Sequence, residues 1–274
     1  MTKVDSKLAR QAKIEAEFFD SLYEDADRNQ RSNNYLVPEK FFKQVTNPKY
    51  PLLDDFEYAY SLLGDIKGKK ILDYGAGDGW NSICFAKAKA NVWAIDVSGK
   101  GIDLIKKKAE ANSVSKFIVA EVQNCYNTQF PADMFEAIYG GGVLHHLDIE
   151  MASREICRIL NPNGVAVFYE PFRESKIMDF LKKVVLRLLG KEASTETENE
   201  SPLTYRKIDH LKAHFGVVNF RPFNVMTSVS PLINSETMEL VLMWLDYFLM
   251  KLIPGFKKLC RAVVIELRQP IKNI

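Results

Sequence analysis

Three glycines at alternating positions, preceded by a carboxylate, form the segment of this sequence best suited to chemistry. The segment Leu72-Asp-Tyr-Gly-Ala-Gly-Asp-Gly-Trp80 places glycines at 75, 77 and 79, and Asp73 stands two residues before the first. Glycines at a strand-to-helix turn let the backbone approach a ligand closely. Asp73 would repel a pyrophosphate but attract a cationic amino group. The spacing also differs from the G-x-G-x-x-G of dinucleotide sites.

Other polar or glycine-rich groups follow apolar runs further along the chain. Such runs predict parallel strands, and ligands bind at the carboxyl ends of parallel strands in an open sheet. We therefore expect these groups to meet at one edge of the sheet. They are Asp96 with Val97, Glu121 with Val122, Gly140-Gly-Gly142, the pair His145 and His146, and Glu170.

Five short apolar runs alternate with helical patterns in the middle of the chain. This alternation predicts an α/β fold with a Rossmann-like, doubly wound sheet and helices on both faces. The predicted strands are 70–74, 91–95, 117–120, 135–139 and 165–169, and two later runs, 223–229 and 262–267, read as further strands. The predicted helices between the first five are 81–89, 101–111 and 149–160.

The flanking segments predict helices around this sheet. Helical spacing of apolar residues appears over 7–27, 51–63, 175–189, 208–215 and 236–253, and 191–201 is polar and acidic. We divide the chain into an N-terminal helical cap, 1–64, and a sheet domain, 65–274. Within that domain, insertions at 171–212 and 232–255 are predicted to roof the site together with the cap.

The composition is that of an ordinary globular protein that handles something small. Of 274 residues, 47% are hydrophobic, and 37 basic against 35 acidic residues give a net charge of +2. That balance supplies no strong overall field to hold a nucleic acid. The four cysteines show no C-x-x-C spacing, which favours buried free thiols. No apolar stretch reaches the roughly 18 residues of a transmembrane helix. We expect a cytoplasmic protein.

The glycine segment and the groups that follow it resemble the class I S-adenosylmethionine-dependent methyltransferase family, small-molecule type. The family's first motif, an acidic residue followed by x-G-x-G-x-G, is matched by Asp73, Gly75, Gly77 and Gly79. The resemblance implies S-adenosyl-L-methionine as cofactor and a seven-stranded sheet whose last strand is antiparallel. It also implies that Asp96 binds the ribose and that Val97 and Val122 flank the adenine. By the same resemblance, Glu121 binds the adenine amino group, and the backbone at Gly140 runs near the methionine part of the cofactor.

The catalytic and substrate residues are less constrained by this resemblance. His145 and His146 are candidate general bases, because histidine titrates near neutral pH, and adjacent residues point different ways, so we expect one at most to face the acceptor. Glu170 is a candidate for holding a polar substrate group, or else a turn residue satisfied by the backbone. Tyr23 and Tyr35 are candidates for closing the site. His210 and His214 have helical spacing but no third ligand, so no metal site is expected.

Several functions remain open at this point. We expect methyl transfer to oxygen, nitrogen or carbon of a small-molecule acceptor, which could be partly hydrophobic. The alternatives are a nucleic-acid methyltransferase, a nicotinamide-dependent oxidoreductase and a non-catalytic binding or scaffold protein of the same fold. The chain lacks [N/D]-P-P-[Y/F/W] after the fourth strand, which argues against base methylation. The apolar helix 236–253 could pack in the core, cover the substrate, form a homodimer face or make a weak membrane contact; a monomer is equally open.

Overall fold

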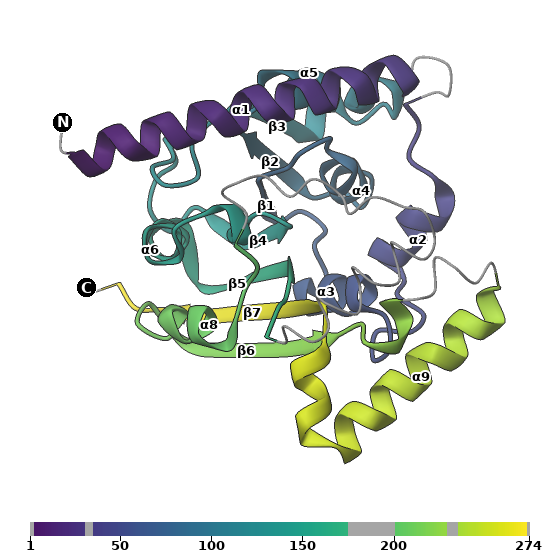
Figure 1. Ribbon diagram of the computed structural model, residues 1–274. Coiled ribbons are helices and arrows are strands. Elements are labelled where there is room, and N and C mark those ends of the chain that lie inside the picture. The colour runs from purple at the N-terminus through teal and green to yellow at the C-terminus, as the bar shows by residue number, and fades with distance from the viewer. Residues whose placement is uncertain (1–2, 31–34, 175–200, 229–234, 273–274) are drawn as a thin grey trace.

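Seven strands form a single sheet in the order β3-β2-β1-β4-β5-β7-β6 (Figure 1). The computed structural model describes residues 3–30, 35–174, 201–228 and 235–272. The strands are β1 Lys70–Tyr74, β2 Asn91–Asp96, β3 Ile118–Val122, β4 Phe135–Gly141, β5 Leu160–Pro171, β6 Phe215–Phe223 and β7 Ala262–Pro270. Strands β1 to β5 pair in parallel, and β7 is antiparallel to both β5 and β6. The predicted sheet and its antiparallel last strand are confirmed.

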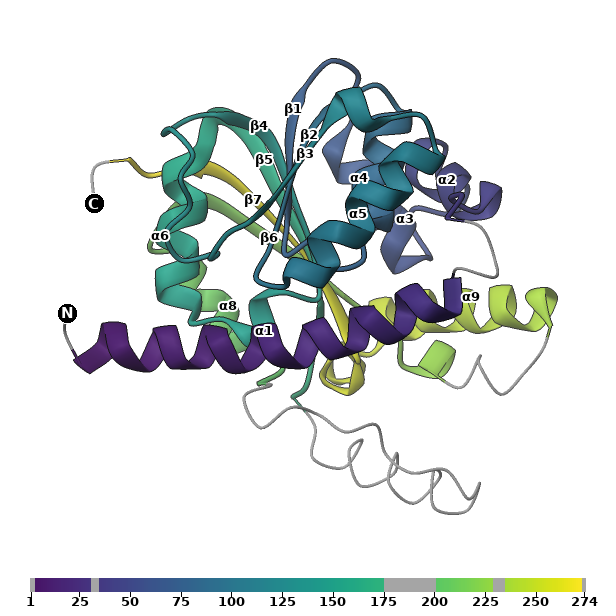
Figure 2. The same ribbon diagram turned by 90° about the horizontal axis from the view of Figure 1, so that it is seen from above.

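Helices cover both faces of this sheet (Figure 2). The α-helices are α1 Lys3–Gln30, α2 Glu39–Thr46, α3 Asp55–Leu63, α4 Trp80–Lys87, α5 Gly99–Ala111, α6 Ile149–Ile159, α8 Tyr205–Leu211 and α9 Glu236–Leu252. Short 3-10 helices are η1 Ser115–Phe117, η2 Leu144–His146 and η4 Pro254–Leu259. Helices α2 to α5 lie on one side of the sheet, and α6 and α8 lie on the other.

The alternation of side chains along β1 explains why both faces need cover. Ile71 packs in a cluster with Ile83 and Phe85 of α4, while its neighbour Leu72 packs in the cluster that contains Ile156 of α6. All five of these side chains are buried. Because successive side chains of a strand point to opposite faces, an uninterrupted apolar run is the pattern of a strand buried on both sides.

Helix α1 is held across the sheet by polar contacts with α5. The Asp20 carboxylate accepts hydrogen bonds from the Ser98 hydroxyl at 2.5 Å and from the Lys100 amide at 3.1 Å. Further along, Lys107 Nζ lies 2.7 Å from Asp27 Oδ2. Ser98 is the N-cap of α5, and Asp20 adds a carboxylate at this helix start, where unpaired backbone N–H groups favour a negative charge.

The sixth strand lies earlier in the chain than the sequence pattern indicates. Residues 215–223 form β6, and the predicted strand 223–229 is wrong. Pro222 sits within β6, which is tolerated because β6 is an edge strand. Beyond it, Asn224 has φ +63°, and the amides of Val225 and Thr227 donate to the Asp246 carboxylate instead of a strand.

Several helix boundaries also differ from the sequence expectation. Helix α3 begins at Asp55, four residues after Pro51, because the Asp54 side chain caps it by accepting from the Glu57 amide. Helix α8 ends at Leu211, so His210 and His214 do not share a helix. Helix α2 was not expected. The predicted helix 175–189 and most of the polar stretch 191–201 lie outside the described residues.

The four cysteines are buried and free of disulfides, which confirms the prediction of buried free thiols. Among the helices of the described residues, none is both long enough and apolar enough to cross a bilayer.

Candidate functional site

A cavity of about 280 Å³ lies at the carboxyl ends of β1, β2 and β4. The strand order reverses between β1 and β4, which makes this the topological switch point where open α/β sheets bind ligands. The cavity is lined by Ala12, Glu15, Phe19, Tyr23, Gly75, Ala76, Gly77, Asp78, Asn81, Asp96, Val97, Asn124, Cys125, Tyr126, Gly141, Gly142, Val143, His146 and Leu147. The predicted convergence of β1, β2 and β4 is thus present in three dimensions.

The glycine loop forms the floor of the cavity. Gly77 has φ +56°, and a Cβ built on it would lie 2.9 Å from the Tyr23 hydroxyl, so only glycine leaves the space open. Gly79 has φ +81° and caps α4; a Cβ there would lie 2.4 Å from Ile105 Cγ1 of α5. Gly77 therefore keeps the cavity open, while Gly79 allows two helices to pack closely and does not line the cavity.

Asp96 ends β2 at the wall of the cavity and fixes the glycine loop. Its Oδ2 accepts from the Gly77 amide at 2.8 Å, and its Oδ1 accepts from the Ser98 amide at 2.9 Å. Burial raises the pKa of the Asp96 carboxyl, and these backbone bonds oppose that shift. The carboxylate can present its remaining lone pairs to a hydroxyl donor at the cavity wall, beside Val97.

Asp73 lies beneath the glycine loop and does not line the cavity. It is 1% exposed, and its Oδ2 accepts from the Ser82 hydroxyl of α4 at 2.5 Å. Burial raises the pKa of the Asp73 carboxyl to about 7, and the Ser82 bonds lower it. Asn81, the neighbour of Ser82, does line the cavity, and its Oδ1 accepts from the Tyr60 hydroxyl at 2.7 Å.

Residues 124–126, after β3, form a wall that sequence reasoning missed. Asn124, Cys125 and Tyr126 line the cavity, whereas Glu121 is exposed, contacts Gln123 at 2.6 Å, and lies outside the lining together with the exposed Val122. The structure therefore does not bring Glu121 and Val122 to the other predicted cofactor residues. Only Gln123 separates the end of β3 from Asn124 at the cavity.

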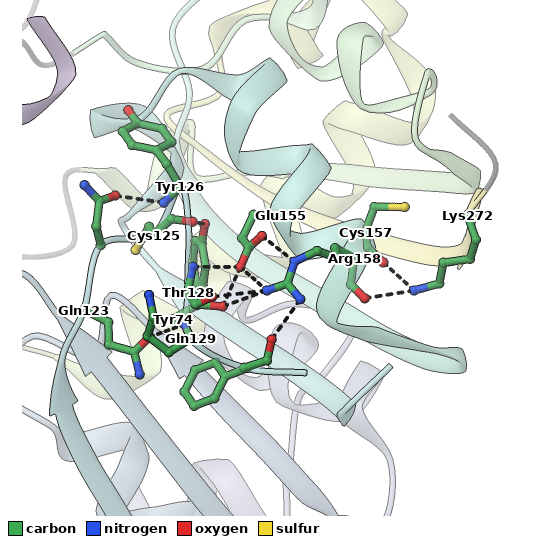
Figure 3. Close-up of polar contacts among 12 residues, drawn as sticks. Tyr74, Gln123, Cys125, Tyr126, Thr128, Gln129, Glu155, Cys157, Arg158 and Lys272 are labelled. Atoms are coloured by element: carbon green, nitrogen blue, oxygen red, sulfur yellow. Dashed lines mark hydrogen bonds and ion pairs between the residues drawn. The ribbon is translucent and has the colours of Figure 1, made fainter. Parts of the chain in front are cut away.

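The loop that carries this wall is anchored from below (Figure 3). The Tyr74 hydroxyl donates to the carbonyl of Cys125, and the buried Glu155 carboxylate accepts from the Thr128 amide at 2.8 Å. Arg158 binds Glu155 through Nε at 2.8 Å and donates to the carbonyl of Phe130 at 2.8 Å. Arg158, in the last turn of α6, therefore positions the loop after β3.

The two histidines after β4 occupy different environments. His146 lines the cavity, with its ring centroid 5.5 Å from that of Phe19. His145 points into the protein, where its Nδ1 lies 2.8 Å from Oε2 of the fully buried Glu170. The Glu170 carboxylate also accepts from the amides of Val143 and Leu144 at 2.9 and 2.8 Å. Glu170 is thus a turn residue satisfied by the backbone, and the structure does not place it against a substrate.

Gly140 is likewise behind the cavity wall. A Cβ on Gly140 would lie 2.6 Å from the ring of Phe168, so its role in this geometry is close packing of β4 on β5. Gly141 and Gly142, the next two residues, line the cavity.

Helix α1 covers the cavity with side chains one to two turns apart. Glu15, Phe19 and Tyr23 reach it from successive turns of the helix. Burial raises the pKa of the Tyr23 hydroxyl above its usual value, and Asp96 and Asp78 add to the shift. Tyr35 does not reach the cavity; its hydroxyl donates to Asp27 Oδ1 at 2.7 Å. Of the two tyrosines proposed to close the site, the structure brings only Tyr23 to it.

The charges at the cavity favour a cationic ligand. Apart from His146, the charged residues that line it are Glu15, Asp78 and Asp96, all acidic. Asp78 is paired with the buried Lys108, whose Nζ lies 2.8 Å from Asp78 Oδ2 and 3.7 Å from the centroid of Trp80. The glycine floor, the acidic wall and the backbone-bound Asp96 together fit an adenosine-type ligand that carries a positive charge.

The sequence of this region matches a known family. Residues 72–168 match the family model described as "Methyltransferase domain". A ubiquinone biosynthesis O-methyltransferase of Actinobacillus pleuropneumoniae is 32% identical over 142 residues, which cover 50% of this chain and 57% of that protein. A ubiquinone/menaquinone biosynthesis C-methyltransferase of Geotalea daltonii is 27% identical over 165 residues, or 56% of this chain and 70% of that protein.

A solved structure has the same fold over nearly the whole chain. That structure is geranyl diphosphate C-methyltransferase from Streptomyces coelicolor in complex with Mg2+, geranyl-S-thiolodiphosphate and S-adenosyl-L-homocysteine. The TM-score is 0.60 at 11% identity, and the match covers 94% of this chain and 98% of that chain. The chain spans only about half the length of the first curated relatives, 57% of each.

Proposed function

We propose that this chain, whose residues 72–168 match a methyltransferase domain, is a class I S-adenosylmethionine-dependent methyltransferase and that it methylates a small-molecule acceptor. One observation supports this above all others. The glycine loop after β1, the carboxylate at the end of β2 and the loop after β3 line one cavity at the switch point of the sheet. The curated relatives and the structural neighbour named above are O- and C-methyltransferases.

We assign the cofactor S-adenosyl-L-methionine to this cavity. Gly75 and Gly77 provide the open backbone, Asp96 accepts from the ribose hydroxyls, and Val97 flanks the adenine. Asp73 acts from beneath, as a buried carboxyl group that holds Ser82 and the start of α4. Asn124 and Cys125, which line the cavity, take the adenine-side positions that the sequence suggested for Glu121 and Val122.

When bound, the cofactor would supply a sulfonium methyl group to the acceptor atom, with its sulfur as the leaving group. The protein's contribution is to hold the acceptor near attack distance and to exclude water. Helix α1 serves the second purpose, since Phe19 and Tyr23 cover the cavity.

His146 is our candidate base for an acceptor that loses a proton. It lines the cavity, whereas Nδ1 of His145 is committed to Glu170. A carboxylate only accepts hydrogen bonds, so Nδ1 of His145 carries the proton of that contact. We therefore assign a structural role to His145 and a proton-accepting role to His146.

The acceptor is proposed to be partly hydrophobic. Phe19, Tyr126 and Leu147 lie with His146 in the cavity lining. We propose that the N-terminal cap 1–64 and the insertions at 171–212 and 232–255 complete the acceptor site around the domain 65–274. Four buried free thiols support a cytoplasmic setting.

Calorimetry tests the cofactor assignment directly. S-adenosyl-L-homocysteine is expected to bind the full chain at micromolar concentration, and NAD under the same conditions is expected not to bind. Failure of S-adenosyl-L-homocysteine to bind would contradict the main proposal. Binding of NAD without binding of S-adenosyl-L-homocysteine would favour a nicotinamide-dependent enzyme. Transfer of a radiolabelled methyl group to cell extract, sorted by solubility of the product, would then identify the acceptor class. His146→Ala is expected to lower that transfer without lowering affinity for S-adenosyl-L-homocysteine.

A further inference from the structure

Helix α9 and the turn after it carry a concentrated row of exposed apolar side chains. Val241, Leu245, Phe248 and Leu252 follow one another at spacings of three and four residues, which places them on one face of the helix. Leu252, at the end of the helix, is 74% exposed. Trp244 joins this face, and its ring stacks on Phe248 with centroids 5.5 Å apart. We call this surface the outer face of α9.

The orientation of this face is fixed by a buried carboxylate on the opposite side of the helix. Asp246 is 3% exposed and accepts from the amides of Val225, Met226 and Thr227 at 3.1, 2.7 and 3.0 Å. Rotating α9 to bury its outer face would expose Met250 and Leu242 and break these bonds to Asp246. The outer face therefore points away from the described body of the protein.

Basic residues gather at the C-terminal end of the outer face. Glu236 and Glu239 are exposed in the first turn of α9, whereas the sequence from residue 240 to residue 259 has a single acidic residue, the buried Asp246. The exposed charges of this stretch are Lys251, Lys257 and Lys258, which lie at the end of α9 and in η4. An exposed apolar face that contains Trp and Phe and is flanked by lysines matches the chemistry of a helix lying in the headgroup region of an anionic bilayer.

A second row of exposed apolar side chains lies on α1. Ile14, Phe18 and Leu22 are exposed at four-residue spacing. Figure 1 shows α1 and α9 at opposite ends of the sheet, so this row is not continuous with the outer face of α9.

We propose that the outer face of α9, with Lys251, Lys257 and Lys258, docks this protein on the surface of an anionic lipid bilayer. Trp244, Phe248 and Leu252 enter the boundary between headgroups and acyl chains, while the lysine ammonium groups stay with the lipid phosphates. The docking does not depend on methyl transfer, because none of these residues lines the cavity.

Co-flotation with vesicles tests the proposal on the full chain without cofactor. The protein is expected to float with vesicles of equal parts phosphatidylcholine and phosphatidylglycerol, and to stay behind with phosphatidylcholine alone or in high salt. Trp244→Ser combined with Phe248→Ser is expected to abolish flotation with an unchanged circular dichroism spectrum. The matched control is Leu36→Ser with Ile271→Ser, which removes exposed apolar side chains elsewhere and is expected to float normally.

Two further measurements separate lipid docking from other occupants. Substitution of the three lysines by glutamate is expected to weaken binding to anionic vesicles about a hundredfold, because each lysine near an anionic surface contributes several-fold to the affinity. Brominated lipid is expected to quench Trp fluorescence in the wild type and less in Trp244→Phe. Absence of flotation overturns the proposal. Concentration-dependent dimerisation that Phe248→Ser abolishes would overturn it in favour of a second copy. Either failure leaves binding of S-adenosyl-L-homocysteine unchanged.

Discussion

Nδ1 of His145 lies 2.8 Å from Oε2 of Glu170, whose side chain is fully buried. The same carboxylate accepts from the three consecutive amides of Val143, Leu144 and His145. The end of β5 therefore holds the turn that follows β4. Because His146 is the next residue of that turn, this contact also sets which histidine faces the cavity.

Removing the Glu170 carboxylate should lower the free energy of unfolding. Glu170→Ala leaves three backbone N–H groups and one imidazole N–H without their acceptor in a buried site, and we expect a loss of about 3 kcal/mol or more. Glu170→Gln keeps one acceptor oxygen and should lose less. Urea unfolding measures both. Glu150→Ala, which removes an exposed carboxylate paired with Arg154, is the control and should change stability by about 0.5 kcal/mol at most. A Glu170→Ala protein as stable as this control would contradict the assignment.

Substitution of Asp96 should weaken cofactor binding more than substitution of Glu121. Asp96 is at the cavity wall, and loss of its charged hydrogen bonds in Asp96→Ala is expected to reduce affinity for S-adenosyl-L-homocysteine by about 1–3 kcal/mol. Glu121→Gln changes an exposed side chain outside the lining and should leave affinity unchanged. Calorimetric titration of both variants, with thermal unfolding to show that they are folded, gives the comparison. Equal losses would restore the adenine role that the sequence suggested for Glu121.

Loosening helix α1 should speed exchange of the bound cofactor. Asp20→Ala removes the side chain that accepts from Ser98 and Lys100, so α1 loses these two hydrogen bonds to the start of α5. Their loss is expected to cost about 1 kcal/mol, and S-adenosyl-L-homocysteine should dissociate several-fold faster in stopped flow. Hydrogen exchange of the α1 amides should rise in parallel. Asp25→Ala, which touches only Arg28 on the exposed side, is the matched control. If dissociation stays at the wild-type rate while exchange of α1 rises, α1 is not the cover of the site.

The free energy of unfolding should fall as pH rises from about 4 to about 7. The pKa of Asp73 is about 7 in the folded protein against an ordinary value of 3.8, so the folded state binds its proton more tightly than the unfolded state does. Between these values the folded state carries the extra proton, and stability decreases with pH until both states are deprotonated above about 7. Asp55, with a pKa of about 6, contributes in the same direction.

Asp73→Asn should make this pH dependence shallower without removing it, because Asp55 remains. Urea unfolding at a series of pH values from 5 to 8 measures the slope. Asp65→Asn, an exposed carboxylate, is expected to leave the slope unchanged. An unchanged slope in Asp73→Asn would mean that Asp73 is not the buried titrating group.

The sequence by itself determined the sheet and the glycine loop. Strands buried on both faces need apolar side chains at nearly every position, so 70–74, 91–95 and 135–139 could be recognised from composition alone. The loop after β1 has positive φ at Gly75, Gly77 and Gly79, and the three glycines in the sequence already indicate such a backbone. Strand β6 was misplaced because an edge strand tolerates proline and polar residues and carries a weaker signal.

Only the tertiary structure decided which side chains reach the site. Glu121 ends up exposed and Asn124 lines the cavity, because the tie between Tyr74 and the carbonyl of Cys125 sets where the chain turns after β3. His146 faces the cavity since Glu170, which is distant in sequence, binds His145. Such contacts join residues far apart in the chain, and neither periodicity nor spacing records them. The direction in which the outer face of α9 points was decided in the same way, by the bonds of Asp246 to residues 225–227.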